Sequence, residues 1–410
     1  MTQTKRGWAD QEDWQVLLGY LPTNYRELAD EHEQVLTKFG STKVADPDDL
    51  LRLILLHVGA NMPLRQTVAL ASEAGGPQLS PMRLHMKMRK AAPYLAALVQ
   101  KLAGRTEAVP ERWGGYDMVA IDGSAICGPG AETTDSRIHL VLRLVDLRLF
   151  DVRVTDVTGG ETFKRFHWLP DQLAIADRGY ANGGGIGWVV DHGADVLVRV
   201  NRGVLRMFET EGEAIDVLER LRSLKGTRAE EWTVTVRDPD KRRLLPGRFV
   251  AARLPEAEAK KARERVIKER GVDVTTDDIE AAEYVALFTT AGKQRLPTQR
   301  CLDAYRLRWQ VELQFKRWKS LCGFDRLPNY RDDTIVAWVY AKVLLGILMD
   351  RMATSASTLF PPEQCAPRPR KPRTRHHVEA HTAASGSPTV ETHQHPVAGH
   401  RRRRPTPAAA

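Results

Sequence analysis

The stretch Asp117-Met-Val-Ala-Ile-Asp122-Gly-Ser124 decides the predicted fold. Its short apolar run is typical of a buried β-strand, and the Gly-Ser pair predicts a turn directly after it. Leu173-Ala-Ile-Ala-Asp177 repeats the pattern, because a short apolar run again ends in an aspartate. We therefore expect two buried strands with an aspartate at the carboxyl end of each, where open α/β sheets bind their ligands.

More strands and helices are expected around these two runs. The residue pattern predicts strands at 138–144, 149–155 and 195–200, and helices at 161–166 and 183–192. Strands followed by an alternation of helix and strand are typical of an α/β sheet. A long helix at 296–321 and an apolar helix at 334–352 are expected to pack on this sheet. The expected core therefore comprises residues 111–200 and 295–355.

Residues 201–294 interrupt this alternation. We expect strands there at 233–237, 248–253 and 284–289, with a charged helix at 256–270 between the last two. The predicted fold is therefore an α/β core interrupted by a mostly β insertion subdomain.

Residues 1–110 are predicted to form a helical N-terminal domain. Ser80 followed by Pro81 is typical of a helix start, and the segment after it carries basic side chains. Together with a helix at 64–74 that ends in two glycines, this segment is a helix-turn-helix candidate for DNA binding. An ordinary helical bundle with a solvated basic face explains the same residues, so both interpretations stay open.

The composition narrows the class of protein. The chain has 410 residues, 42% of them hydrophobic, and no apolar run reaches the roughly 18 residues of a membrane helix. No secretory signal follows Met1, so we expect a bacterial cytoplasmic protein. The four cysteines form no C-x-x-C pair and are expected to be free thiols rather than zinc ligands.

The last 50 residues differ in kind from the rest. The net charge of +9 suggests a polyanionic partner, but residues 361–410 hold nine basic and three acidic residues and so carry most of that charge. They are rich in Pro, Arg and His without a helical or strand period, and we expect a disordered tail. A DNA-binding arm is the alternative interpretation of this tail.

The two aspartates are candidates for metal binding. Two carboxylates on neighbouring strands suit Mg²⁺, because this hard cation prefers oxygen ligands. Taken alone, each of Asp122 and Asp177 is equally consistent with a cap on a turn or on the following helix.

A third carboxylate lies on the helix predicted at 296–321. At about 100° per residue, one narrow sector of this helix contains Tyr305, Arg308, Glu312 and Lys319. A separate sector that can face the core contains Leu307, Val311, Phe315 and Trp318. The first set combines a carboxylate that can bind metal with cations and a phenol that can bind phosphate oxygens. A solvated charged face explains the charges but not the tyrosine or the single-file arrangement.

With these motifs the chain resembles the DDE transposases of bacterial insertion sequences, and among them the IS-four-type group. The signature of that group, Y-x2-R-x3-E-x6-K, matches Tyr305, Arg308, Glu312 and Lys319. The D-G-S motif matches at Asp122 and the D-R-G-Y motif at Asp177, in the order of the family. The long β-rich gap before the glutamate is also typical, and the resemblance covers roughly residues 45–350.

The resemblance implies an RNase H-like catalytic core and a metal-dependent enzyme. Asp122, Asp177 and Glu312 would bind two Mg²⁺ or Mn²⁺ ions for cleavage and strand transfer of DNA at terminal inverted repeats. The contacts to the phosphates of the transposon ends would come from Tyr305, Arg308 and Lys319, with Arg178 as a further contact to the DNA backbone.

The expected partners are the double-stranded DNA of both transposon ends and of the target, bound by a homodimer in a synaptic complex. The protein would associate with the nucleoid when bound to DNA. A degenerate copy that only binds DNA ends and a metal nuclease without strand transfer are the alternatives. Tyr284 opens the last insertion strand, where some relatives place a tryptophan that stacks on an extruded base, but we expect a core aromatic there.

Overall fold

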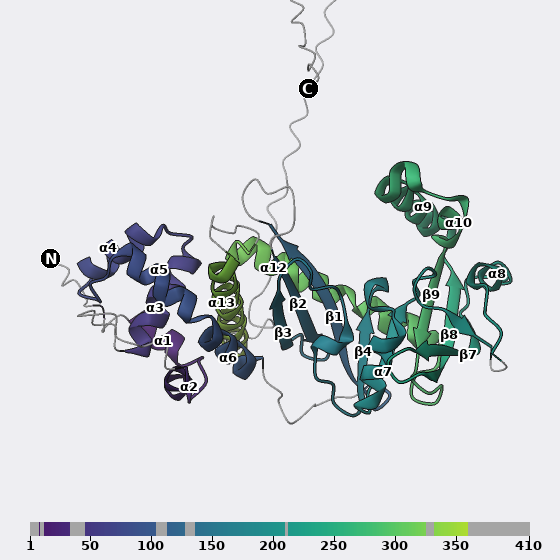
Figure 1. Cartoon of the computed structure of the whole chain (residues 1–410), viewed down its shortest axis with the longest axis horizontal. Coiled ribbons are helices and arrows are strands. Elements are labelled where there is room, and N and C mark those ends of the chain that lie inside the picture. The colour runs from purple at the N-terminus through teal and green to yellow at the C-terminus, as the bar shows by residue number, and fades with distance from the viewer. Residues whose placement is uncertain are drawn as a thin grey trace, which may run out of the picture. The chain divides into compact units, whose positions relative to one another are not determined.

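The computed structural model describes residues 8, 12–32, 46–103, 113–127, 136–209, 212–324 and 332–359 (Figure 1). The chain divides into two units, Met1–Leu359 and Phe360–Ala410, and only the first contains described residues. The predictions for the tail and for Cys365 therefore lie outside the described residues. The described part is a mixed α/β structure with one large sheet.

The predicted helical character of the N-terminal region is confirmed. Within the described residues, the helices before the first strand are α1 (Glu12–Leu18), α2 (Tyr25–Glu31), α3 (Pro47–Gly59), α4 (Leu64–Glu73), α5 (Pro81–Lys90) and α6 (Ala92–Leu102). The hydroxyl of Ser80 accepts a hydrogen bond from the backbone N–H of Arg83 at 3.3 Å, with Pro81 at the first helical position. This capped start is the one that the sequence predicts.

The basic face of α5 is only partly solvated. Lys87 is buried, and a ring nitrogen of His85 lies 3.1 Å from the hydroxyl of Thr334 in α13 (Asp332–Leu359). Arg83 and Arg89 are exposed. Part of the basic segment therefore packs against the rest of the protein, and two of its arginines face solvent.

The strands form a single nine-stranded sheet (Figure 1). They are β1 (Asp117–Ile126), β2 (Ser136–Arg143), β3 (Leu149–Thr155), β4 (Gln172–Ala176), β5 (Asp195–Arg199), β6 (Met207–Phe208), β7 (Glu230–Asp238), β8 (Arg243–Arg253) and β9 (Tyr284–Thr289). Their order is β3-β2-β1-β4-β5-β9-β8-β7-β6. The pairs β1–β4 and β4–β5 are parallel, and the other pairs are antiparallel.

The strands of residues 201–294 extend the same sheet. Leu197 to Arg199 of β5 pair with Leu287 to Thr289 of β9 in antiparallel register, so the sheet is continuous across the two regions. Three helices, α8 (Val217–Arg222), α9 (Glu256–Arg270) and α10 (Thr276–Ala281), lie between these strands along the chain. The predicted strands and charged helix are all present, and the backbone groups at the edge of β5 are satisfied by β9.

Each face of the sheet packs against its own set of elements. Ala120 and Leu140 point to the face that packs against α6, α12 and α13. Ile121 and Val141 point to the other face, which packs against Phe163 and the helix α7 (Gly183–Asp191). Because side chains alternate along a strand, Asp122 shares the face of Ala120 and points toward α12 (Trp309–Cys322).

The prediction of one helix at 296–321 is wrong in one respect. α11 (Thr298–Leu307) and α12 are separate helices that meet at Arg308. The backbone N–H of Arg308 donates to the carbonyl oxygen of Tyr305, and the N–H of Val311 donates to that of Arg308. These are tight bonds between residues three apart, which turn the chain by about 120° per residue instead of about 100°.

The tightened turn also explains a misplaced side chain. Val311, Phe315 and Trp318 are buried as predicted, but Leu307, which was expected on the same face, is 37% exposed. Leu307 precedes the turn and the other three residues follow it. The extra rotation therefore moves Leu307 away from the face that they share.

Two further local predictions are wrong. β1 does not stop at a turn after Asp122, because Gly123 to Ile126 continue to pair with β2. β2 supplies backbone hydrogen-bond partners for these residues, and the Gly-Ser pair in the sequence gives no indication of them. The helix expected at 161–166 is limited to a 3-10 turn at Phe163–Arg165, where Thr162 accepts a hydrogen bond from the backbone N–H of Lys164.

The described residues also bear on the predictions about the cysteines and about membrane helices. Cys127, Cys301 and Cys322 are free thiols, as predicted. Among the described helices, none combines the length and the apolarity that a membrane span requires.

Candidate active site at the edge of β1 and β4

Asp122 and Asp177 lie level with each other on neighbouring parallel strands. Ile121 of β1 pairs with Ala176 of β4, so the next residue on each strand is one of the two aspartates. β4 ends at Ala176, and Asp177 leads into the 3-10 turn Arg178–Tyr180. The two carboxylates therefore meet where β4 ends, as the two strand patterns predict.

The junction of α11 and α12 brings a third carboxylate to the same place. The hydroxyl of Tyr305 donates to Oδ1 of Asp177 at 3.1 Å. Nη2 of Arg308 donates to Oε1 of Glu312 at 2.6 Å, and Nη1 of Arg308 lies 3.9 Å from Oδ2 of Asp122. Residues that are far apart in the sequence are thus joined through Tyr305 and Arg308.

The pKa values of the two aspartates are shifted in opposite directions. Burial raises the pKa of Asp122 to about 6, although Arg308 and the backbone of Gly123 act in the other direction. Burial also acts to raise the pKa of Asp177, but the backbone of Arg178 and the charges of Arg308 and Arg199 hold that pKa below its usual value. Asp177 is therefore ionised at neutral pH, whereas Asp122 titrates close to it.

Arg308 is the cation that these carboxylates share. Its side chain is 14% exposed, and burial disfavours its charge, yet Tyr305, Glu312 and Asp177 together raise the pKa of its guanidinium. Because Arg308 is paired with Glu312, its fork of donors faces protein oxygens in this structure. Among the described residues, no three His, Cys, Asp or Glu side chains are close enough together to hold one metal ion.

Two other predicted DNA contacts lie at the border of this site. Nζ of Lys319, about two turns beyond Glu312 on α12, donates to the hydroxyl of Ser124 at 3.1 Å. Lys319 is thus beside the D-G-S motif, as the helical stripe predicts. Arg178 is half-exposed and lies 3.9 Å from Glu269 of α9 in an ion pair.

Two charged residues near the aspartates are absent from the sequence prediction. Arg199 ends β5, and its charge acts on both Asp177 and Tyr305. Asp122 and Asp177 are predicted because each is a charged residue at the end of an apolar strand. Arg199 has the same signal, since it is the first charged residue after the apolar run of β5. Glu161 lies near the two motif glycines, Gly123 and Gly179, and no sequence pattern used above points to it.

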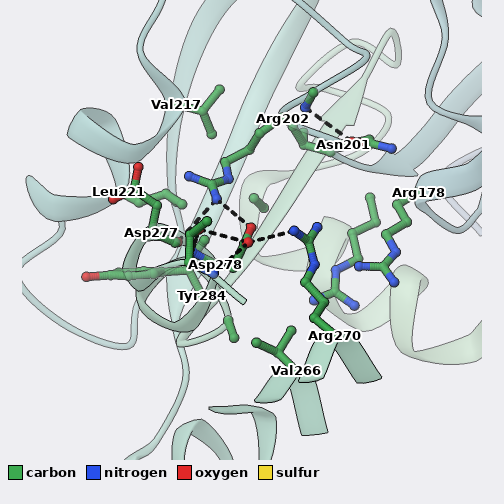
Figure 2. A pocket seen from close by; sticks show the side chains of 17 residues that line it. Arg178, Asn201, Arg202, Val217, Leu221, Val266, Arg270, Asp277, Asp278 and Tyr284 are labelled. Carbon is green, nitrogen blue, oxygen red and sulfur yellow. Dashed lines mark hydrogen bonds and ion pairs between the residues drawn. The ribbon is translucent and has the colours of Figure 1, made fainter. Parts of the chain in front are cut away.

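A cavity of about 520 Å³ opens between β5, β9 and the helices α8 to α10. Four arginines line it: Arg178, Arg199, Arg202 and Arg270. Figure 2 shows Arg202 and Arg270 pointing at Asp278, with which they form ion pairs at 3.2 and 2.6 Å. Tyr284 lines the cavity but is only 7% exposed, which agrees with the expectation of a core aromatic.

Comparisons with known proteins identify the family. Residues 133–348 match the family model described as the transposase DDE domain. The chain is 31% identical over 327 residues to the putative transposase InsL for insertion sequence element IS186A from Escherichia coli (strain K12), which covers 78% of this chain and 88% of that protein. The chain belongs to the DDE transposases of bacterial insertion sequences. The transposase for insertion sequence element IS421 from Escherichia coli is also 31% identical to it, over 328 residues with the same coverage.

A more distant similarity links this transposase to the transposase for insertion sequence element IS231F from Bacillus thuringiensis subsp. israelensis. That match is 30% identical over 123 residues, or 29% of this chain and 23% of that protein. The family match includes Asp177, Glu312 and the stripe on α12, whereas Asp122 precedes the matched residues. Transposases of this family act on DNA with the help of divalent metal ions.

Proposed function

We propose that this transposase cleaves and joins DNA at the terminal inverted repeats of its own insertion sequence, with Asp122, Asp177 and Glu312 as the ligands of two Mg²⁺ or Mn²⁺ ions. The convergence of these carboxylates on one guanidinium, that of Arg308, supports the proposal most. A structural ion pair needs one carboxylate for one arginine. Three carboxylates near the charges of Arg308 and Arg199 leave net negative charge, which favours the binding of divalent cations.

The chemistry of the donor set fits such ions, and the carboxylates of the described residues have to move closer together to hold one. Carboxylate oxygens are the ligands that Mg²⁺ and Mn²⁺ prefer, and two of these carboxylates come from neighbouring strands. Glu312 accepts the bond from Arg308 through Oε1, so its second oxygen is available to a metal ion while the pair persists.

The side chains of the site have different roles in phosphodiester transfer. The bound divalent ions supply Lewis acidity at the attacking and leaving oxygens, so no protein nucleophile is required. Tyr305 orients the carboxylate of Asp177 through its hydrogen bond. Arg308 and Lys319 bind phosphate oxygens of the DNA end and so align the scissile bond, with Arg178 as a further backbone contact.

We also propose a division of the chain by role. Residues 111–200 and 295–355 form an RNase H-like catalytic core, which is supported by three consecutive antiparallel strands followed by two parallel ones in the order β3-β2-β1-β4-β5. Residues 201–294 are an insertion subdomain, and residues 1–110 bind DNA through the exposed arginines of α5. Two copies bind two transposon ends in the synaptic complex, in the bacterial cytoplasm at the nucleoid.

Substitution of the three carboxylates tests the proposal. Asp122→Asn, Asp177→Asn and Glu312→Gln should each abolish Mg²⁺-dependent cleavage of a DNA fragment that carries the element's end, while end binding is retained. Asp273→Asn, at an exposed position in the insertion, is the matched control and should cleave normally. Near-normal cutting by any of the three variants would remove that residue from the site.

A strand-transfer assay with pre-cut ends separates the proposal from its alternatives. The wild-type protein should join such ends to target DNA. A metal nuclease would cut uncut ends without joining them, and a degenerate copy would bind ends without cutting.

A further inference from the structure

Glu161 occupies the space beside the glycines of both aspartate motifs. A Cβ on Gly179, two residues after Asp177, would overlap Oε2 of Glu161 and lie 2.8 Å from its Cδ. A Cβ on Gly123, directly after Asp122, would lie 3.5 Å from Oε1 of the same side chain. The carboxylate of Glu161 therefore lies between the two motifs, and the absence of a side chain at Gly179 makes room for it.

This carboxylate forms no ion pair within the described residues. No hydrogen bond or ion pair joins Glu161 to another side chain in the part of the chain that the structure describes, although Glu161 is half-buried. Burial, followed by the charge of Asp177, raises the pKa of Glu161, although the charges of Arg137 and Arg178 act in the other direction. A partly buried carboxylate beside a second one is unfavourable unless a cation compensates both.

A buried hydroxyl points to the same place independently. The side chain of Tyr180 is fully buried, and its hydroxyl has no hydrogen-bond partner among the described residues. After burial, the charges of Glu161 and Asp122 are the largest influences on this phenol. A buried donor without a partner is unfavourable, and a carboxylate that turns toward it when a cation binds would accept its hydrogen bond.

We propose that Glu161 is a fourth carboxylate of the divalent-metal site, and that Gly179 is a glycine because the side chain of Glu161 must reach between Asp122 and Asp177. The proposal rests on the metal site assigned above. The chemistry is that of a hard oxygen ligand that approaches from the loop before the 3-10 turn Phe163–Arg165 rather than from the sheet or α12.

Metal binding by the full-length protein without DNA tests this proposal. Glu161→Gln should weaken Mn²⁺ binding, measured by isothermal titration calorimetry, by about tenfold or more. Its melting temperature without metal should not fall, because the substitution removes a charge that faces Asp177. Glu264→Gln, at an exposed position on α9, is the matched control and should bind Mn²⁺ as the wild type does.

A second pair of variants tests the geometry. Gly179→Ala should lower both the melting temperature and the Mn²⁺ affinity, because its methyl group displaces the Glu161 carboxylate. In Gly179→Ala/Glu161→Ala the melting temperature should recover while Mn²⁺ binding stays weak, since the three atoms nearest to the new Cβ all belong to Glu161. An equal loss of stability in both backgrounds would show that the carboxylate does not lie there.

The outcomes distinguish this proposal from the function on which it rests. If Asp122→Asn and Glu312→Gln weaken Mn²⁺ binding but Glu161→Gln does not, the fourth ligand is rejected and the metal site stands. If none of the three variants changes Mn²⁺ binding, the metal site itself is rejected, and the fourth ligand with it.

Discussion

At the scale of one residue, the buried charge of Asp122 lowers the stability of the folded protein. Its folded pKa of about 6 lies above the value of about 3.9 for an unfolded aspartate. A proton bound to folded Asp122 therefore stabilises the protein fully below pH 4. This contribution is lost as the pH rises through 6, and above pH 6 the buried charge is a net cost that Arg308 and the backbone of Gly123 offset only in part.

We predict that Asp122→Asn stabilises the metal-free protein at pH 7.5 by about 1–3 kcal/mol, because asparagine carries no charge to bury. The gain should shrink as the pH falls from about 6 and vanish near pH 4. Urea unfolding at several pH values measures it. The matched control is Asp273→Asn at an exposed position. A gain of equal size at pH 4 and pH 7.5 would contradict the role of burial.

Lys319 offers a second test at the residue scale. Its ammonium group lies against Ser124, beside the carboxylate site. If it binds a phosphate of the transposon end, Lys319→Ala should weaken end binding and reduce the slope of log K against log salt concentration by about 1. Fluorescence anisotropy with end DNA at several salt concentrations gives that slope.

The control for Lys319 lies outside α12. Lys241, in the turn between β7 and β8, is exposed and forms an ion pair with Asp191 at 2.8 Å. Lys241→Ala should keep the wild-type slope. Equal slopes for both variants would indicate that Lys319 has a structural role.

At the scale of helices, the position of α12 depends on its contact with α13. A Cβ on Gly346 of α13 would lie 2.8 Å from Nε1 of Trp318 in α12. The same Nε1 donates to Asp350 at 3.4 Å, and Gln314 donates to that carboxylate at 2.9 Å. This contact supports the helix that carries Glu312 and Lys319.

We predict that Gly346→Ala lowers the free energy of unfolding by up to about 2 kcal/mol. Alanine is better than glycine in a helix by about 1 kcal/mol, but the overlap with Trp318 costs about 1–3 kcal/mol and a shift of α12. Denaturant unfolding measures the change, and DNA cleavage should fall with it. In a Trp318→Leu background the same substitution should be neutral or stabilising, and an unchanged penalty there would place the strain elsewhere.

At the scale of the whole molecule, the described residues already contain a complete core. The buried residues of α13 pack against the N-terminal helices and one face of β1 to β3, and the rest of the sheet is covered by its own clusters. Composition changes abruptly after Phe360, toward Pro, Arg and His without a regular period. We therefore expect the core to fold without residues 361–410.

We predict that a truncation ending at Phe360 keeps the melting temperature of the full-length protein and its affinity for a single transposon end. Differential scanning calorimetry and anisotropy at physiological salt measure the two properties. The alternative, a DNA-binding arm with Arg401 to Arg404 on phosphates, predicts a large fall in end affinity and a smaller salt slope for the truncated protein.

Sequence alone determined the elements and the motifs of this transposase. Apolar runs of strand length predicted β4, β5 and β9 closely, because a buried strand needs an uninterrupted apolar segment wherever its partners lie. The spacing of Tyr305, Arg308, Glu312 and Lys319 predicted one functional face, because helical geometry is local. A Ser-Pro pair predicted the start of α5 for the same reason.

Only the tertiary structure decided the features that depend on contacts between residues distant in sequence. It extended β1 past Asp122 along β2, and it joined β9 to β5 so that the insertion strands continue the sheet. It also broke the helix at Arg308 and placed Glu161 between two glycines. Backbone pairing, electrostatic neighbours and the space left by an absent side chain are set by contacts across long stretches of chain, and no local pattern carries them.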